Sequence, residues 1–166
     1  MSAGYSLISG QDEDDRSIGS SGGPLNHQSQ MRNPPMRVRD YMTAKAITID
    51  AGADYQQAFE IMERHGLHHL PVTDGQQRVV GLLTRRDMQM AARLFHEAPA
   101  EVSDVMHTPV TTIAPDAPLA AAIDLMMDGH IGCLPVSEDG GSHLVGIITE
   151  TDLMRALSDL LARQGK

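Results

Sequence analysis

The chain has 166 residues, of which 41% are hydrophobic and 21% charged, which suits one ordinary domain or two small ones with a packed core. A formal net charge of −9 argues against a duplex nucleic-acid binder, because neutralising phosphates requires a basic face. Cys133 is the chain's one cysteine, which excludes an intramolecular disulfide and favours a reducing cytoplasm, and neither a secretory signal nor a membrane-spanning run is expected.

Residues 1–36 differ in composition from the rest of the chain. They are rich in Ser, Gly, Gln, Asn and Pro and carry an acidic cluster at residues 12–15. Such a segment buries too little apolar area to offset the entropy lost on ordering, so a disordered tail is predicted. The alternatives are a partner-binding segment or an intramolecular strap through Tyr5, Leu7 and Ile8.

After residue 36 the chain repeats itself. One copy begins at Val38 and the other at Val102, and they stay in step except for one extra residue at Gly140-Gly141. Identical pairs run through both copies: Asp40/Asp104, Met42/Met106, Thr48/Thr112, Ile49/Ile113, Ala58/Ala122, Met62/Met126, Gly81/Gly146, Thr84/Thr149 and Asp87/Asp152. This order indicates a tandem duplication, with 37–98 as the first repeat and 99–163 as the second. Two copies favour a pseudo-twofold pair that buries a shared face.

Each repeat is predicted to be an α/β unit of the order β-α-β-β-α. The expected strands are 46–49, 67–73 and 79–83 in the first repeat, and 110–113, 131–137 and 144–148 in the second. Apolar residues at helical spacing predict the first helix of each repeat: Tyr55, Ala58, Phe59 and Met62, then Leu119, Ala122, Ile123 and Met126. Gly66 and Gly129 are expected to end these helices, and a final helix is expected after Thr84 and after Thr149.

Several further residues have expected structural roles. Asp116 is predicted to cap the second repeat's first helix, with Pro118 in its first turn, and Asp40 and Asp104 are expected to be capping acids. Five methionines are expected in the core or between the repeats, with an adaptable partner surface as the alternative: Met62, Met88, Met90, Met126 and Met127.

The sharpest local motif is Gly-apolar-apolar-Thr-x-x-Asp, which occurs as Gly81-Thr84-Asp87 and as Gly146-Thr149-Asp152. A Thr at a helix N-cap with an acid three residues later resembles a capping box, which has a purely structural use. The same groups also suit a ribose, because a carboxylate accepts hydrogen bonds from sugar hydroxyls and the helix N-terminus favours a nearby phosphate. Both interpretations can hold at once.

These features together resemble a tandem cystathionine-β-synthase (CBS) domain pair, over about residues 37–163. The resemblance is carried by the Val-x-Asp-x-Met openings, the Ile-Thr-Ile and Thr-Thr-Ile strands, both Leu-Pro-Val triplets and both Gly-apolar-apolar-Thr-x-x-Asp segments. It implies two repeats packed through their sheets in pseudo-twofold symmetry, two clefts between them, and often a dimer of such modules.

The resemblance also implies a set of ligand-binding residues. Thr84 and Asp87 would contact ribose in one cleft, and Thr149 and Asp152 in the other. The first strand and the residue before Pro of Leu-Pro-Val would line the adenine pocket, which here gives Ala46, Ile47 and Leu70, then Val110, Thr111 and Leu134. The implied ligands are AMP, ADP, ATP or S-adenosylmethionine.

The two residues before Leu-Pro-Val differ between the repeats. In nucleotide-sensing members of the family this place often holds basic residues that grip phosphate across the module. Here it holds His68-His69 in the first repeat and the uncharged Gly132-Cys133 in the second. The resemblance therefore favours Thr149 and Asp152 working with His68 and His69, so Asp152→Ala is expected to weaken nucleotide binding more than Asp87→Ala.

The other cleft has a different source of charge. Arg85 and Arg86 follow Thr84 and could supply charge there, whereas their counterpart Glu150-Thr151 would repel phosphate. For the cluster of His65, His68 and His69 the alternatives are phosphate contact, a metal, or ordinary histidines. Zinc needs three or four ligands in tetrahedral geometry, and no nearby Cys or acid completes that set. Cys133 is expected to be a small buried hydrophobe.

No nucleophile with a nearby base and no catalytic motif is found, so the chain is predicted not to be an enzyme. The leading hypothesis is a regulatory module that senses an adenosyl ligand and signals through an effector protein or an oligomer such as a homodimer. A dimerisation or interaction scaffold without a ligand is the alternative. Single-stranded nucleic-acid binding is disfavoured by the net charge and by the low aromatic content of 3%.

Overall fold

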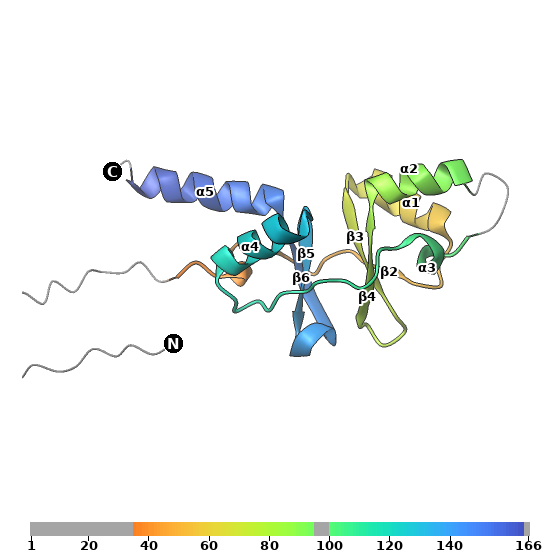
Figure 1. Ribbon diagram of the computed structural model, residues 1–166, viewed down its shortest axis with the longest axis horizontal. Helices are drawn as coiled ribbons and strands as arrows, with labels where there is room; N and C mark the ends of the chain where they lie inside the picture. Colours follow the sequence, from red (N-terminus) through yellow and green to blue (C-terminus); the bar gives the residue numbers. More distant parts are fainter. Residues whose placement is uncertain (1–34, 95–99, 165–166) are drawn as a thin grey trace, which may run out of the picture. The chain divides into compact units, whose positions relative to one another are not determined.

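The computed structural model describes residues 35–94 and 100–164, which form two small sheets with their helices (Figure 1). The elements in chain order are η1 (Val38–Asp40), β1 (Thr43–Ala44), β2 (Ile49–Asp50), α1 (Tyr55–His65), β3 (His69–Thr73), β4 (Val79–Thr84), α2 (Arg85–Leu94), α3 (Val102–Val105), α4 (Leu119–Gly129), β5 (Cys133–Glu138), η2 (Asp139–Gly141), β6 (His143–Thr149) and α5 (Glu150–Gln164). The predicted tail lies outside the described residues except for Pro35 and Met36.

The β3-β4 hairpin of one sheet and the β5-β6 hairpin of the other are related by the repeat. One has the order β2-β3-β4, with β2 parallel to β3 and β3 antiparallel to β4. The other has the order β1-β6-β5, with both pairs antiparallel. The first strand of each repeat is shorter than predicted: β2 pairs only Ile49 and Asp50, and in the second repeat Ile113 alone bridges Val136. The predicted β-α-β-β-α order is otherwise confirmed.

Each opening segment packs into the half built mainly by the other repeat. Val38 is fully buried in the core of Leu134 and Ile148, whereas Val102 is fully buried in the core of Leu70 and Leu83. The backbone follows the same exchange, since Leu119 N donates to Met36 O at 2.9 Å. The sequence period at 37–98 and 99–163 therefore does not coincide with the two structural halves.

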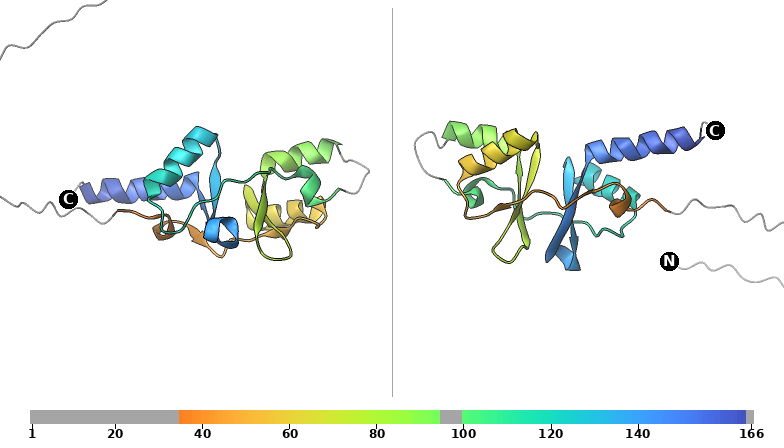
Figure 2. Two further views of the ribbon diagram at one scale, coloured as in Figure 1. Left: turned by 60° about the horizontal axis from the view of Figure 1, so that its bottom comes forward. Right: turned by 180° about the vertical axis from the view of Figure 1, so that it is seen from behind.

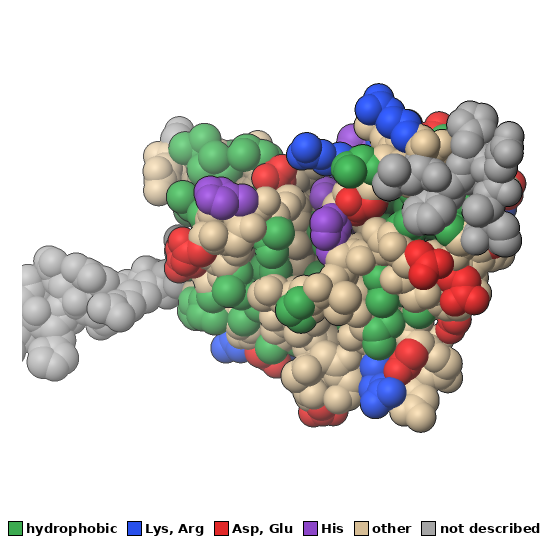
Figure 3. All heavy atoms as spheres, turned by 45° about the vertical axis from the view of Figure 1, so that its right-hand side comes forward, with side chains coloured by type: hydrophobic (Ala, Val, Ile, Leu, Met, Phe, Trp, Pro, Cys, Tyr) green, Lys and Arg blue, Asp and Glu red, His purple; other side chains and the backbone are tan. Residues whose placement is uncertain are grey.

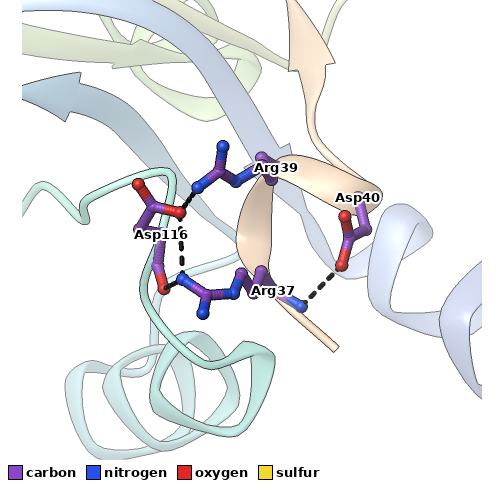
Figure 4. A network of polar contacts seen from close by, with 4 residues as sticks. All are labelled: Arg37, Arg39, Asp40 and Asp116. Atoms are coloured by element: carbon purple, nitrogen blue, oxygen red, sulfur yellow. Dashed lines mark hydrogen bonds and ion pairs between the residues drawn. The ribbon is translucent and has the colours of Figure 1, made fainter. Parts of the chain in front are cut away.

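Asp116 does not cap α4, which corrects the prediction (Figure 4). Pro118 is the N-cap of α4 and gives no side-chain hydrogen bond. The Asp116 carboxylate instead pairs with the guanidinium groups of Arg37 and Arg39 from the opening segment. Because all three side chains are about half exposed, this network orients the segment more than it stabilises it. Met36 O accepts from Leu119 N, which satisfies the first free N–H of α4.

The other predicted caps are confirmed. Gly66 ends α1 in a left-handed conformation, with φ 63°. Asp40 Oδ2 accepts from Arg37 N at 2.8 Å, and Asp104 Oδ2 accepts from Glu101 N at 2.9 Å. α4 runs through Gly129, and His130 takes the left-handed position one residue later, with φ 50°.

The sheets face each other and the helices lie on their outer sides, as both views of Figure 2 show. Leu82, Cys133 and Ile147 are buried between them, with Ala46 and Val110 packed against this cluster. The predicted packing of two repeats through their sheets is confirmed.

The methionines divide into two groups. Met62, Met88 and Met126 are buried, as predicted, but Met90 and Met127 are 54% and 68% exposed. The methionines of one helix are spread over a wider face than one sheet can cover. Those at the margin of that face, Met90 and Met127, therefore remain at the surface. Within the described residues no helix combines the length and apolar composition needed to cross a bilayer.

Candidate ligand clefts

The Thr and Asp of each Gly-apolar-apolar-Thr-x-x-Asp motif lie where a strand ends and a helix begins. Asp87 Oδ2 accepts hydrogen bonds from Thr84 N and Thr84 Oγ1, both at 2.7 Å. Asp152 Oδ2 accepts the equivalent bonds from Thr149 at 2.9 and 2.8 Å. The capping interpretation is thus confirmed at both places, and each pair fixes one carboxylate oxygen while leaving the other to its surroundings.

The first cleft, which we call the Thr84 cleft, is a cavity of about 440 Å³ that both halves of the molecule line. Its lining includes Thr84, Arg86 and Asp87 from the β4–α2 junction, the segment from His107 to Thr111, and residues His130 to Cys133. Asp87 Oδ1 is 2.8 Å from His107 Nε2, and the Asp87 side chain is 11% exposed. Asp87 and His107 both line the cavity, so their contact lies at its wall and Oδ1 is the oxygen that the capping box leaves open to a ligand.

The second cleft, which we call the Thr149 cleft, measures about 400 Å³. It is lined by Thr149, Glu150 and Thr151 from the β6–α5 junction, by Thr43, and by residues Gly66 to His69. Asp152 is not among its lining residues: its side chain is 4% exposed, and Oδ1 accepts from Arg155 at 3.1 Å. The two equivalent aspartates are thus differently placed.

His69 stands between the clefts and lines both of them, together with Gly132. A β-carbon at position 132 would lie 3.3 Å from the His69 ring, so the ring is packed against this glycine. Burial lowers the pKa of His69 from 6.5, and the neighbouring His68 lowers it further, while Glu150 and Asp87 act in the opposite direction. Figure 3 shows histidine side chains gathered on one face of the molecule.

We expect this histidine to make the fold less stable in acid. The unfolded chain takes up a proton near pH 6.5 more readily than the folded chain does, so the free energy of unfolding should fall as the pH drops below that value. His69→Gln should flatten this dependence in urea denaturation performed at about pH 7.5 and 5.5. Equal loss of stability in both proteins over this range would contradict the expectation.

Cys133 lies at the inner wall of the Thr84 cleft and is 1% exposed. Burial raises the pKa of its thiol to about 12, and the nearby Glu150 adds to the shift. The thiol therefore stays protonated at neutral pH, in agreement with the prediction that it is a small buried hydrophobe.

The structure places the predicted site residues as follows. Thr84, Asp87, Arg86, Val110 and Thr111 line the Thr84 cleft, and His68, His69 and Thr149 line the Thr149 cleft. Ala46 packs between the sheets, and Ile47 is 39% exposed.

Six predicted positions line neither cleft: Asp152, Ala46 and Ile47, as described above, and Leu70, Leu134 and Arg85. Leu70 and Leu134 are fully buried in the two cores, because alternate residues of a strand face opposite sides. The cleft-facing positions are one residue earlier, at His69 and Cys133. Arg85 forms an ion pair with Glu63 of α1 and does not line the Thr84 cleft.

Two histidines that line the Thr84 cleft were not predicted as site residues from the sequence. His107 follows the second Val-x-Asp-x-Met opening, and its strand-like bridge to Leu82 brings it to the cleft. His130 takes the left-handed position after α4, whereas the first repeat has Gly66 at the equivalent place. For His130 the sequence did contain a signal, because a residue with a β-carbon stands where the other repeat has a glycine. Among the described residues, no three potential metal-binding side chains gather in one cluster.

The geometry defines a tandem α/β module with two clefts between its halves. A CBS domain profile matches residues 38–93 and 102–159. A Vibrio cholerae protein described as AcuB, for acetoin utilization, is 32% identical with a TM-score of 0.72, covering 81% of this chain and 100% of that one. The CBS domain pair of protein MJ0100, solved with 5′-methylthioadenosine and S-adenosyl-L-methionine, is 27% identical with a TM-score of 0.68, covering 76% and 98%.

Similarity extends to CBS regions of larger proteins. The A-adding tRNA nucleotidyltransferase of Geobacter sulfurreducens is 35% identical over 127 residues, which are 76% of this chain but 14% of that enzyme. With both repeats matched, the chain belongs to the CBS domain family.

Proposed function

We propose that this chain is a regulatory module that binds an adenine nucleotide or another adenosyl ligand in the Thr84 cleft. One observation carries the proposal: Asp87, held by a capping box through Oδ2, lines a cavity between the two halves and has Oδ1 left for a ligand beside His107. A ligand held there touches both halves, so it can favour one arrangement of them over another. Such a bias extends only as far as the ligand's affinities for the two arrangements differ.

A ribose fits the polar groups of this cleft. Asp87 Oδ2 already accepts two hydrogen bonds from Thr84, but Oδ1 accepts one from His107 and retains capacity for another. Thr84 Oγ1 donates to Asp87 and can accept a second hydroxyl. A vicinal diol therefore finds two acceptors side by side.

The remaining lining suits an adenine ring. Leu82, Val110 and Ile131 give apolar surface, and Gly132 brings backbone to the wall without a side chain. Binding pockets for such ligands are mostly apolar with a few well-placed polar groups. The likeness to the MJ0100 domain pair, solved with two adenosyl compounds, supports this ligand class.

The test is a thermal-shift screen of the full chain with adenosine, AMP, ADP, ATP and S-adenosylmethionine. A ligand at about 100 times its dissociation constant adds about 2.7 kcal/mol to stability, so a true ligand should raise Tm by several degrees. Guanosine and cytidine phosphates are the matched controls. No shift with any adenosyl compound would overturn the proposal.

The second candidate function is a ligand-independent scaffold, favoured by the apolar surface of α4 and α5. Met127, Met154 and Leu157 are 68%, 65% and 48% exposed and line a groove of about 920 Å³. We propose a second copy of the chain as its occupant, since twofold dimers are the commonest soluble homo-oligomers. Sedimentation velocity on the same samples separates the functions: a dimer indifferent to every adenosyl compound supports the scaffold.

A further inference from the structure

The two clefts are built from equivalent positions of the repeat but differ in charge. In the Thr84 cleft, Arg86, His107 and His130 line the cavity. At the matching positions of the Thr149 cleft the chain has Thr151, Thr43 and Gly66. One arginine and two histidines in the Thr84 cleft thus correspond to two threonines and a glycine in the Thr149 cleft.

Each cleft has one acidic lining residue, Asp87 in the Thr84 cleft and Glu150 in the Thr149 cleft, but Asp87 is hydrogen-bonded to His107. Glu150 lines the Thr149 cleft, and its repeat equivalent is Arg85. Arg85 adds no charge to the Thr84 cleft, because it forms an ion pair with Glu63 and is not a lining residue of that cleft. The basic lining of the Thr149 cleft consists of His68 and the shared His69, with Glu150 beside them.

His130 adds an independent observation. It holds φ 50° and ψ 41° at the end of α4, a conformation that costs a residue with a β-carbon about 1 kcal/mol or more and costs glycine little. The first repeat uses Gly66 at this place. The second repeat thus places an imidazole on the cavity wall where the first repeat has no side chain.

We infer that the Thr84 cleft takes the phosphorylated form of the ligand, an adenosine 5′-phosphate whose phosphate lies among Arg86, His107 and His130. The Thr149 cleft does not take this phosphate, because Glu150 repels an anion there. This inference rests on the proposed function and reverses the preference that His68 and His69 suggested in the sequence.

Exchange of residues between the clefts tests the inference by calorimetry of the full chain with AMP and with adenosine. Arg86→Thr should lower AMP affinity about tenfold or more, the loss of one charge-assisted phosphate contact, and change adenosine affinity less than about twofold. The reverse exchange, Glu150→Arg with Thr151→Arg, should raise the AMP stoichiometry from one to two per chain. His130→Gly should weaken AMP binding while raising Tm.

Arg85→Thr is the matched control. It removes a positive charge next to Arg86 in the sequence, but Arg85 does not line the Thr84 cleft. Equal losses of AMP affinity for Arg85→Thr and Arg86→Thr would show diffuse attraction and overturn the inference. Two equivalent AMP sites in the unaltered chain would overturn it as well. In both of these cases adenosine still binds, so only the assignment of the phosphate would be wrong. If the proposed function itself is wrong, neither adenosine nor AMP binds.

Discussion

Replacing Asp87 with asparagine should lower the affinity for an adenosyl ligand by about 10- to 100-fold. A hydrogen bond to a charged group contributes about 1.5–3 kcal/mol, and Asp87 Oδ1 is the acceptor that the capping box leaves open to a ligand. Asparagine can keep a carbonyl oxygen on Thr84 N, which preserves the start of α2, but it then turns an amide N–H₂ toward the sugar hydroxyls. Calorimetric titration with the best ligand from the screen measures the loss.

Asp152→Asn is the matched control. Asp152 has the same capping bonds, but its second oxygen is held by Arg155 and its side chain is 4% exposed. We expect its affinity to stay within about twofold of the unaltered chain. A larger loss for Asp152→Asn than for Asp87→Asn would restore the sequence-based expectation and reject the Thr84 cleft as the main site.

The comparison of these aspartates shows how far the sequence could lead. The spacing of Thr and Asp predicts a capping box at both helix starts, because capping depends only on residues three apart. Whether the remaining oxygen meets a cavity or an arginine depends on His107 and Arg155. The first of these comes from the other repeat's opening, and no local pattern specifies that contact.

The exchange of opening segments was hidden for the same reason. Val38 and Val102 are the same residue type, and each lies in a core built from largely equivalent positions of the repeat. Sequence periodicity shows that a residue is buried but not which of two similar cores buries it. Strand alternation was available from the start, however, and it would have put His69 and Cys133, rather than Leu70 and Leu134, at the clefts.

Gly146→Ala should cost about 3 kcal/mol of unfolding free energy, whereas Gly81→Ala should cost about 1 kcal/mol. The two glycines hold equivalent motif positions, and neither has a positive φ, so their backbone conformations suit alanine equally. A β-carbon on Gly146 would lie 2.6 Å from the carbonyl oxygen of Thr43. That oxygen belongs to β1, which pairs with β6 at this point, so neither strand can move without losing the ladder.

On Gly81 the nearest obstacle is the Met106 side chain. An unbranched thioether can rotate away at modest cost, which backbone cannot do. Urea denaturation of both variants gives the comparison, and Gly146→Ala should also lose amide-exchange protection at Lys45, whose N–H donates to Val145 O. Equal costs for the two substitutions would mean that β1 is loosely held. The opening segment that contains Val38 would then stabilise the core around Leu134 and Ile148 less than the full burial of Val38 implies.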